Sequence, residues 1–433
     1  MNRSLALGSA TLLALVLTAL PGWIALNRGD APAPDDRDLR VARSASAGSE
    51  NGYTRFEAAS QAARLPRDGP TWDRFHAFRA GQSWEPEWIS ELVAQNAAAT
   101  ALLRAGLASP AFAFALPGDA RAGNTRVATL FRVQQLIALA GAQARILLRD
   151  GNSRDAIELA SLGLRAGKRL SEAEDVDLLG LAMARTFQSL SLIDLEHAAR
   201  STRLAPDAAR RLVLVLESTR LRAEDWRRAW SIEYERLLAD VDALGAASSS
   251  AGIWSMSLES PLLLLPHAYR WHPNQTVAVL AELYRGQRRK SALFCADAGL
   301  AGDRGADLAQ ATRLTSALAP NALGRLVIGQ VRARDLDRFQ FDRCQLETHA
   351  SLVEALIAAK AYSDSEGALP ARLEDLVPRY LDTLPLDRYV GAPLRYARAA
   401  PAVYSIGADL ADAGGGASPN PDDPDEPGLS LAF

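Results

Sequence analysis

Proline and glycine are spaced very differently in the two parts of this 433-residue chain, and their spacing decides which elements each part can form. Between Tyr53 and Leu346 apolar side chains recur mostly at helical intervals, with breakers only between the periodic stretches. After Pro370 prolines and glycines come every few residues, too often for a long helix. The sequence therefore predicts a mainly α-helical chain: a multi-helix body and a small α+β C-terminal domain with short antiparallel strands.

Shifts in composition divide the chain into five segments. They are a membrane anchor or signal at 1–26, a disordered tether at 27–50, an all-α helical body at 51–346, an α+β tail at 347–416 and an acidic, mobile C-terminus at 417–433. Start and stop signals predict helices at 84–108, 124–149, 153–168, 171–199 (with Ser171 and Glu174 as a capping box), 206–244, 276–289, 306–318 and 336–362. Short strands are predicted at 394–396 and 402–406.

The N-terminus carries a long apolar run. Residues 5–26 are uncharged and mostly apolar, and about 20 such residues cross the hydrocarbon core of a bilayer. No Ala-x-Ala cleavage site precedes Asn27, which favours an uncleaved anchor, whereas Pro21 and Gly22 keep a signal peptide open as the alternative. Arg3 and Arg28 flank the run and set its orientation poorly.

These features predict where the chain resides and what it meets. We expect a single-pass protein of the inner membrane, held through residues 5–26, with its body in the periplasm and an unidentified envelope protein as partner. The net charge of −3 is close to neutral for this length, so no field recruits nucleic acid.

The chain has two cysteines, Cys295 and Cys344. In an oxidising compartment they could form a disulfide, which is worth about 4 kcal/mol on the chain-entropy view. The alternative is two buried thiols. Two cysteines at this spacing make no zinc site.

An aromatic stripe stands out in the body. Trp226, Trp230 and Tyr234 are spaced four residues apart, so a helix places them on one face, and Glu233 lies beside them. Such a stripe is either core packing or a ligand-binding face. A carboxylate among indoles could have a raised pKa and serve as the acid of a hydrolase, which would also need a second carboxyl group.

Motifs of known chemistry are missing from the sequence. It has no glycine-rich phosphate loop, no Gly-x-Ser-x-Gly elbow and no His-Glu-x-x-His zinc helix. The leading hypothesis is therefore a non-enzymatic scaffold or interaction protein of the bacterial envelope. The alternative is an envelope hydrolase that uses Glu233 near the Trp226/Trp230 stripe.

The tail has an ordered series of breakers and anchors. In order they are Ala361-Tyr362, Gly367-Ala368-Leu369-Pro370, Leu376-Val377-Pro378, Tyr380-Leu381, Leu384-Pro385, Gly391-Ala392-Pro393-Leu394-Arg395-Tyr396, Tyr404-Ser405-Ile406-Gly407-Ala408-Asp409 and Asp412-Ala413-Gly414-Gly415. This series resembles the C-terminal domain of the major pseudopilins of type II secretion systems. The whole chain is similar to uncharacterised membrane-anchored bacterial proteins that join a helical body to such a tail.

The resemblance implies a calcium site and a link to secretion. Calcium in those pseudopilins is held by carboxylates and backbone carbonyls of the corresponding loop, which puts Asp409 and the carbonyl of Ser405 on ligand positions. Three further carboxylates are candidates: Asp412, Asp422 and Asp423. The alternative is a solvated acidic turn. A third functional hypothesis follows, a calcium-stabilised tail that docks on secretion machinery.

Two departures limit the resemblance. A pseudopilin has its membrane helix directly before this domain, whereas here the body intervenes. The Asp-Pro expected after Leu-Pro is replaced by Leu386-Asp387-Arg388-Tyr389. Assembly into a pseudopilus is therefore not implied.

Overall fold

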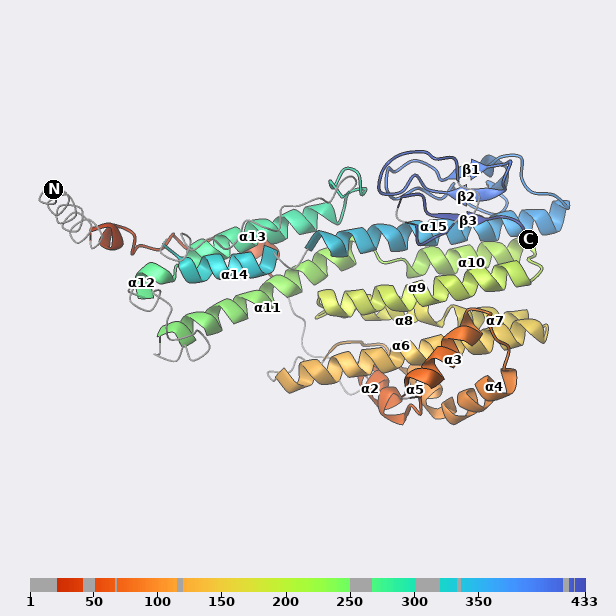
Figure 1. The fold of residues 1–433 in the computed structure, drawn as a ribbon, viewed down its shortest axis with the longest axis horizontal. Helices are drawn as coiled ribbons and strands as arrows, with labels where there is room; N and C mark the ends of the chain where they lie inside the picture. The colour runs from red at the N-terminus through yellow and green to blue at the C-terminus, as the bar shows by residue number, and fades with distance from the viewer. Residues whose placement is uncertain are drawn as a thin grey trace, which may run out of the picture. The chain divides into compact units, whose positions relative to one another are not determined.

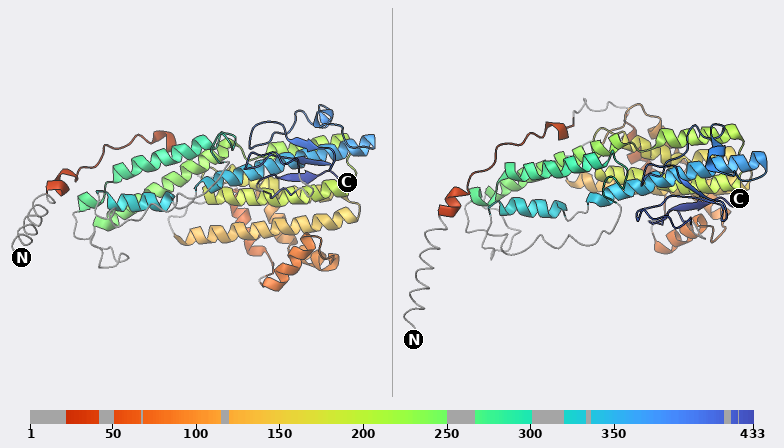
Figure 2. Two further views of the ribbon diagram at one scale, coloured as in Figure 1. Left: turned by 45° about the horizontal axis from the view of Figure 1, so that its top comes forward. Right: turned by 90° about the horizontal axis from the view of Figure 1, so that it is seen from above.

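The computed structural model describes residues 22–41, 51–66, 68–114, 120–249, 267–300, 320–332, 336–415, 420–423 and 425–433 (Figures 1 and 2). These residues are mainly helical, with one small antiparallel sheet, as predicted. They form two compact units. The smaller lies within Met1–Val41, Ser231–Gln287 and Arg304–Leu336, and the larger within Ala42–Trp230, Arg288–Asp303 and Asp337–Phe433.

Helices α2 to α10 all belong to the larger unit. They are α2 (Gly52–Ala62), α3 (Gly69–Arg79), α4 (Pro86–Gln95), α5 (Ala97–Leu107), α6 (Ala120–Arg149), α7 (Ser153–Ala160), α8 (Leu162–Ser171), α9 (Leu178–Ser201) and α10 (Pro206–Thr219). The remaining helices are α11 (Ala223–Ser249), α12 (His267–Arg270), α13 (Pro273–Lys290), α14 (Ala322–Arg332) and α15 (Leu336–Glu366), together with the 3-10 turns η1 (Arg37–Leu39) and η5 (Leu373–Leu376).

Helices α8 and α9 lie side by side in the larger unit because glycine removes the side chains between them (Figure 1). A Cβ at Gly163 would stand 2.2 Å from the carbonyl oxygen of Phe187, and one at Gly167 would stand 2.5 Å from that of Ala184. The amide of Gly163 donates to the hydroxyl of Ser191 at 2.8 Å. Two glycines one helical turn apart thus let α8 approach α9 closely enough for a backbone amide of α8 to reach a side-chain hydroxyl of α9.

We expect Gly163→Ala to destabilise the larger unit by about 1–3 kcal/mol, because the added methyl group forces the helices apart. Gly286→Ala is the matched control, since nothing lies within 4 Å of a Cβ at that position in α13. A helical Gly→Ala change at an open site stabilises by roughly 0.5–1 kcal/mol. Chemical denaturation of both variants tests the contrast, and equal effects would show that the close approach has no energetic weight.

Several predicted helices are divided or begin elsewhere. The stretch 153–168 is split between α7 and α8 at Ser161, and 206–244 is split between α10 and α11. The predicted capping box is wrong: the hydroxyl of Ser171 donates back to the carbonyl of Lys168 at 2.8 Å, and Ser171 ends α8. Asp177 caps α9 instead, accepting from the amide of Gly180 at 2.8 Å. The predicted helix 306–318 lies outside the described residues.

The segment 27–41 is not the disordered tether that its composition predicts. Its residues pack along helices of the smaller unit, and Leu39 is fully buried. The hydroxyl of Tyr234 donates to Asp36 at 2.8 Å, and the amide of Val41 donates to Glu235 at 2.9 Å. Charged residues that look solvated in the sequence here find partners on α11 and α13. The rest of the predicted tether, 42–50, lies outside the described residues.

The C-terminal module contains the predicted strands and one more. β1 (Arg395–Ala397), β2 (Ala402–Tyr404) and β3 (Gly428–Ser430) form an antiparallel sheet in that order, with Tyr396 opposite Val403 and Val403 opposite Leu429. The third strand corrects the prediction of a mobile end at 417–433. Leu429 and Leu431 are buried, so the acidic stretch is followed by apolar residues that complete the sheet.

Most of the predicted membrane run, residues 5–21, lies outside the described residues. Residues 22–26, its last turn, are helical. Among the described residues, no helix is both long enough and apolar enough to cross a bilayer.

Candidate functional site

The two tryptophans of the aromatic stripe are core residues of the larger unit. Trp226 is 1% exposed and Trp230 is 0% exposed. The ring of Trp230 meets that of Phe339 edge to face, with centroids 6.1 Å apart. Neither indole offers a free face to a ligand, so the structure supports the packing alternative for this part of the stripe.

Tyr234 and Glu233 belong to the smaller unit. Tyr234 is also fully buried, with its ring centroid 5.7 Å from that of Tyr284. Burial raises the pKa of the Tyr234 phenol, and the adjacent Asp36 carboxylate raises it further. Glu233 is half-buried. Tyr234 therefore holds the 27–41 segment in place rather than facing a ligand.

The tail carboxylates are engaged in local hydrogen bonds and an ion pair. Asp412 pairs with the guanidinium of Arg395 and accepts from the hydroxyl of Tyr404 at 3.1 Å. Asp409 accepts from the amide of Ala411 at 2.9 Å, and Asp423 accepts from the amide of Asp425 at 3.0 Å. Each of these three carboxylates stabilises a turn of its own loop.

These residues do not fit the calcium site that the pseudopilin resemblance implies. Within the parts of the chain that the structure describes, no three His, Cys, Asp or Glu side chains gather closely enough to hold a metal ion. Calcium takes six to eight oxygens, and Asp412 would have to give up Arg395 to supply one. Ser405 is fully buried, and the backbone amide of Asp422 donates to the side-chain oxygen of Asn420 at 3.0 Å.

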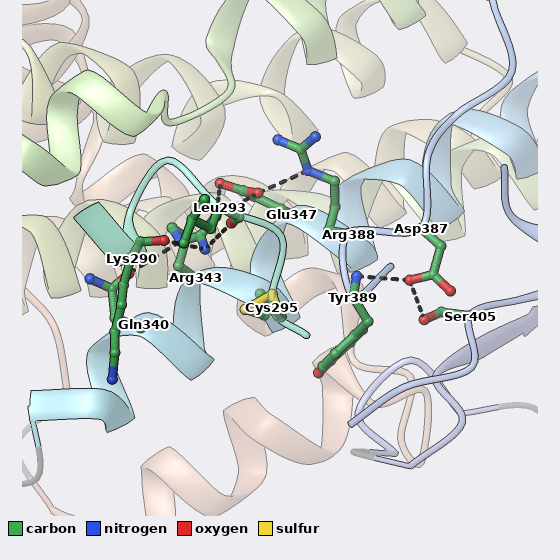
Figure 3. The surroundings of a disulfide bond; sticks show 11 residues. Lys290, Leu293, Cys295, Gln340, Arg343, Glu347, Asp387, Arg388, Tyr389 and Ser405 are labelled. Atoms are coloured by element: carbon green, nitrogen blue, oxygen red, sulfur yellow. Dashed lines mark hydrogen bonds and ion pairs between the residues drawn. A yellow bond between two sulfur atoms is a disulfide. The ribbon is translucent and has the colours of Figure 1, made fainter. Parts of the chain in front are cut away.

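A different carboxylate, Asp387, organises the C-terminal module (Figure 3). It is 1% exposed and accepts three hydrogen bonds: from the Ser405 hydroxyl at 2.8 Å, the Tyr389 amide at 2.9 Å and the Ile406 amide at 3.0 Å. A buried carboxylate needs such donors to offset its lost hydration. Asp387 thereby fixes the turn after Pro385 to the chain that leaves β2.

Beside Asp387 lies a cluster that we name the clasp, formed by Cys295, Arg343, Cys344, Glu347 and Arg388 (Figure 3). Cys295 and Cys344 form a disulfide with their Cα atoms 6.3 Å apart, and both are 0% exposed. The bond joins the loop after α13 to α15. The amide of Cys295 also donates to the carbonyl of Arg388 at 3.2 Å, so three chain segments meet here.

The charged part of the clasp is a carboxylate between two guanidinium groups. Glu347 accepts from Arg343 at 3.2 Å and from Arg388 at 2.9 Å. Arg343 also donates to the carbonyl of Leu293 at 2.9 Å. Charges that leave water need partners of this kind. The polar groups of the clasp bind one another and the backbone, so the arrangement holds segments together and exposes no nucleophile.

The sequence contains part of the signal for the clasp. Arg343 and Glu347 are four residues apart on a predicted helix, a spacing that pairs opposite charges. Arg388 belongs to the four residues after Pro385 that depart from the pseudopilin pattern. No pattern in the neighbouring sequence links it to Glu347. The roles of Asp387 and Arg388 therefore became visible only in the fold.

His349 lies further along α15 and is buried. Burial lowers the pKa of its imidazole from 6.5 to about 4, although the nearby Asp422 carboxylate opposes the shift. The unfolded chain therefore binds a proton at a higher pH than the folded chain does. The stability from this group is fully present above about pH 6.5 and is lost as the pH falls towards 4. His197 shifts in the same direction, to about 4, chiefly through burial and then through Arg145 and Arg200.

We expect the free energy of unfolding to fall by on the order of 3 kcal/mol through His349 between about pH 6.5 and pH 4. Urea titrations at several pH values measure the slope. His349→Gln should make the slope shallower but not flat, because His197 contributes over the same pH range, whereas His76→Gln, at an exposed position on α3, should leave it as in the wild type. An unchanged slope in His349→Gln would contradict the assignment.

Comparison with known proteins identifies no relative. No family model matches the chain, and no match is found among curated proteins or solved structures. The similarity of the tail to pseudopilins therefore rests on its motifs alone.

Proposed function

We propose that this chain is a non-enzymatic scaffold or interaction protein of the bacterial envelope, anchored in the inner membrane by residues 5–26 with its units in the periplasm. The observation that carries the proposal is the buried disulfide between Cys295 and Cys344. Structural disulfides persist in oxidising compartments such as the periplasm and are rare in the cytosol. The apolar run at the N-terminus supplies the anchor.

The state of the aromatic stripe supports a scaffold over a hydrolase. A hydrolase acid at Glu233 would need a pocket with a second carboxyl group and an accessible aromatic wall. Trp226, Trp230 and Tyr234 are all buried. The clasp and Asp387 likewise use their polar groups to join segments. A protein whose polar side chains form internal hydrogen bonds and ion pairs is rigid, and a rigid protein is suited to presenting a fixed surface to a partner.

Cell fractionation combined with thiol trapping tests the proposal. Cells that express the full chain are quenched in acid, and free thiols are labelled with a polyethylene glycol maleimide under denaturing conditions. We expect the full chain in the membrane fraction, without label until a reductant is added. The matched control lacks residues 5–26 and should be soluble in the cytosol with both thiols labelled. A full chain that is soluble and labelled would overturn the proposal.

The resemblance of the tail suggests that the envelope partner belongs to secretion machinery. Leu410 is 40% exposed in the tail, and Leu214 is 52% exposed on α10. A photo-crosslinking residue at position 410 should capture a component of a secretion system, and one at position 214 should not. Capture from both positions, or from neither, would leave the tail without a specific role in docking.

A further inference from the structure

The chain is fixed to the smaller unit directly after the apolar run. Asp30 caps the N-terminus of α13: its carboxylate accepts from the amides of Asn274 at 2.8 Å and Gln275 at 3.1 Å. The side-chain amide of Asn274 donates in return to the carbonyl of Ala31 at 2.8 Å. An acidic residue at a helix N-terminus satisfies free amides and meets the positive end of the helix dipole. Here the capping residue comes from a distant part of the sequence.

A second set of bonds holds the other end of this segment. The guanidinium of Arg285 on α13 contacts both carboxylate oxygens of Asp38, at 3.0 and 2.6 Å. Tyr234 on α11 binds Asp36, and Leu39 is buried next to it in the chain. We call residues 30–41 the strap. It is bonded at both ends, so no free linker separates the apolar run from the smaller unit.

The last turn of the apolar run also touches this unit. Trp23 is 54% exposed, and its indole N–H donates to the hydroxyl of Tyr269 on α12 at 3.1 Å. Leu26, three residues on, is 83% exposed. Trp and Tyr are enriched at membrane–water interfaces because each combines an apolar ring with one polar group, and Trp23 exposes its ring while its N–H is bonded to Tyr269.

We propose that the end of the smaller unit formed by Trp23, Leu26 and α12 rests in the headgroup region of the lipid bilayer. The inference rests on the proposed anchoring through residues 5–26. The bilayer is the occupant because residues 22–26 continue that apolar run. Six residues lie between Trp23 and Asp30, which caps α13, so the chain from Trp23 to this cap spans at most about 25 Å.

The strap therefore makes the membrane anchor fix the orientation of the smaller unit relative to the bilayer. A flexible tether would let the unit tumble away from the membrane. A capped and ion-paired strap holds α12 against the surface and directs α13 away from it. The smaller unit then has a fixed membrane-proximal end, which a scaffold needs if its partners are also held in the membrane.

Fluorescence quenching in nanodiscs tests this orientation with the full chain. Ala268 on α12 and Glu282 on α13 are both exposed and can each be changed to cysteine, while the native cysteines stay in their buried disulfide. An environment-sensitive fluorophore on either cysteine reports contact with nitroxide groups on lipid headgroups. The label at 268 should lose fluorescence in nitroxide-bearing discs, and the label at 282 should lose little. Asp30→Ala, which removes the cap, should restore fluorescence at 268 while the chain remains in the discs.

The outcomes separate this inference from the proposed function. If the chain enters the discs but the label at 268 is quenched no more than the label at 282, the orientation is wrong and the anchoring stands. If a protein rather than lipid covers the end formed by Trp23, Leu26 and α12, the orientation is likewise wrong and the anchoring stands. If the chain does not associate with the discs at all, both proposals fall.

Discussion

Replacing Cys295 and Cys344 together by alanine is expected to lower the free energy of unfolding by about 4 kcal/mol, because the disulfide closes a loop of 49 residues in the unfolded chain. The loss should be concentrated in the larger unit, since the bond pins the loop after α13 to α15. Urea unfolding under non-oxidising and oxidising conditions measures it. Both cysteines of the disulfide are fully buried, so reduction of the wild-type protein should be slow until the unit opens.

Reduction provides the internal control for this variant. Wild-type protein that has been unfolded, reduced and refolded should show the same midpoint as the double variant, and a reductant should not change the variant further. A double variant as stable as the oxidised wild type would mean that the charged part of the clasp holds these segments without the covalent bond.

Arg220→Ala is expected to cost about 3–5 kcal/mol, because it leaves a buried carboxylate without its partner. Arg220 lies between α10 and α11 and binds Glu354 of α15 through two contacts, Nε to Oε1 at 3.2 Å and Nη2 to Oε2 at 2.6 Å. The side chain of Glu354 is 4% exposed. Burial raises the pKa of Glu354 even with Arg220 beside it, so removing the guanidinium should raise that pKa further.

The sign of the pH dependence follows from this shift. A carboxyl group whose folded pKa is raised is least costly when protonated, so the deficit of Arg220→Ala should shrink as the pH is lowered. Arg379→Ala is the matched control: Arg379 binds Glu366 at 2.7 Å, but both side chains are exposed, by 60% and 44%. Its cost should be about 0–1 kcal/mol. Equal losses in the two variants would show that the Arg220 pair is no more than a surface contact.

The elements that the sequence predicts well are those set by local periodicity. α13 and α15 lie within a few residues of the predicted 276–289 and 336–362, and β1 and β2 within one or two of the predicted strands. Their apolar spacing and flanking breakers act within the element itself. The fold class follows from the same signals.

The errors arise where distant residues intervene. The helix breaks between α10 and α11 at Thr219 and Arg220. The side-chain amide of Gln188 on α9 donates to the carbonyl of Thr219 at 2.6 Å, and Arg220 forms an ion pair with Glu354. Asp225 then caps the new helix through the amide of Arg222 at 2.8 Å. No local residue forbids a continuous helix at this place. Tertiary bonds overrode helix propensity.

The candidate sites also divide into features that the local sequence shows and features that only the fold shows. The stripe of Trp226, Trp230 and Tyr234 is visible in the sequence, but only packing decides that it faces inward. The pairing of Cys295 with Cys344 is one of two alternatives in the sequence, and proximity in the fold selects it. Asp387 accepts one local bond, from the amide of Tyr389, but its other two donors, on Ser405 and Ile406, come from a segment that no local pattern links to it.

The continuity of α15 bears on whether the body could exist without the tail. The residues predicted as a separate tail begin at 347, but the helix runs unbroken from Leu336 to Glu366. Its far half serves body and module at once: Asp364 accepts from the amide of Leu204 at 2.8 Å, while Tyr362 meets Tyr380 with ring centroids 5.8 Å apart. A chain cut short after residue 346 would lose these contacts and leave the end of α15 exposed. The body and the tail are therefore expected to be stable only together.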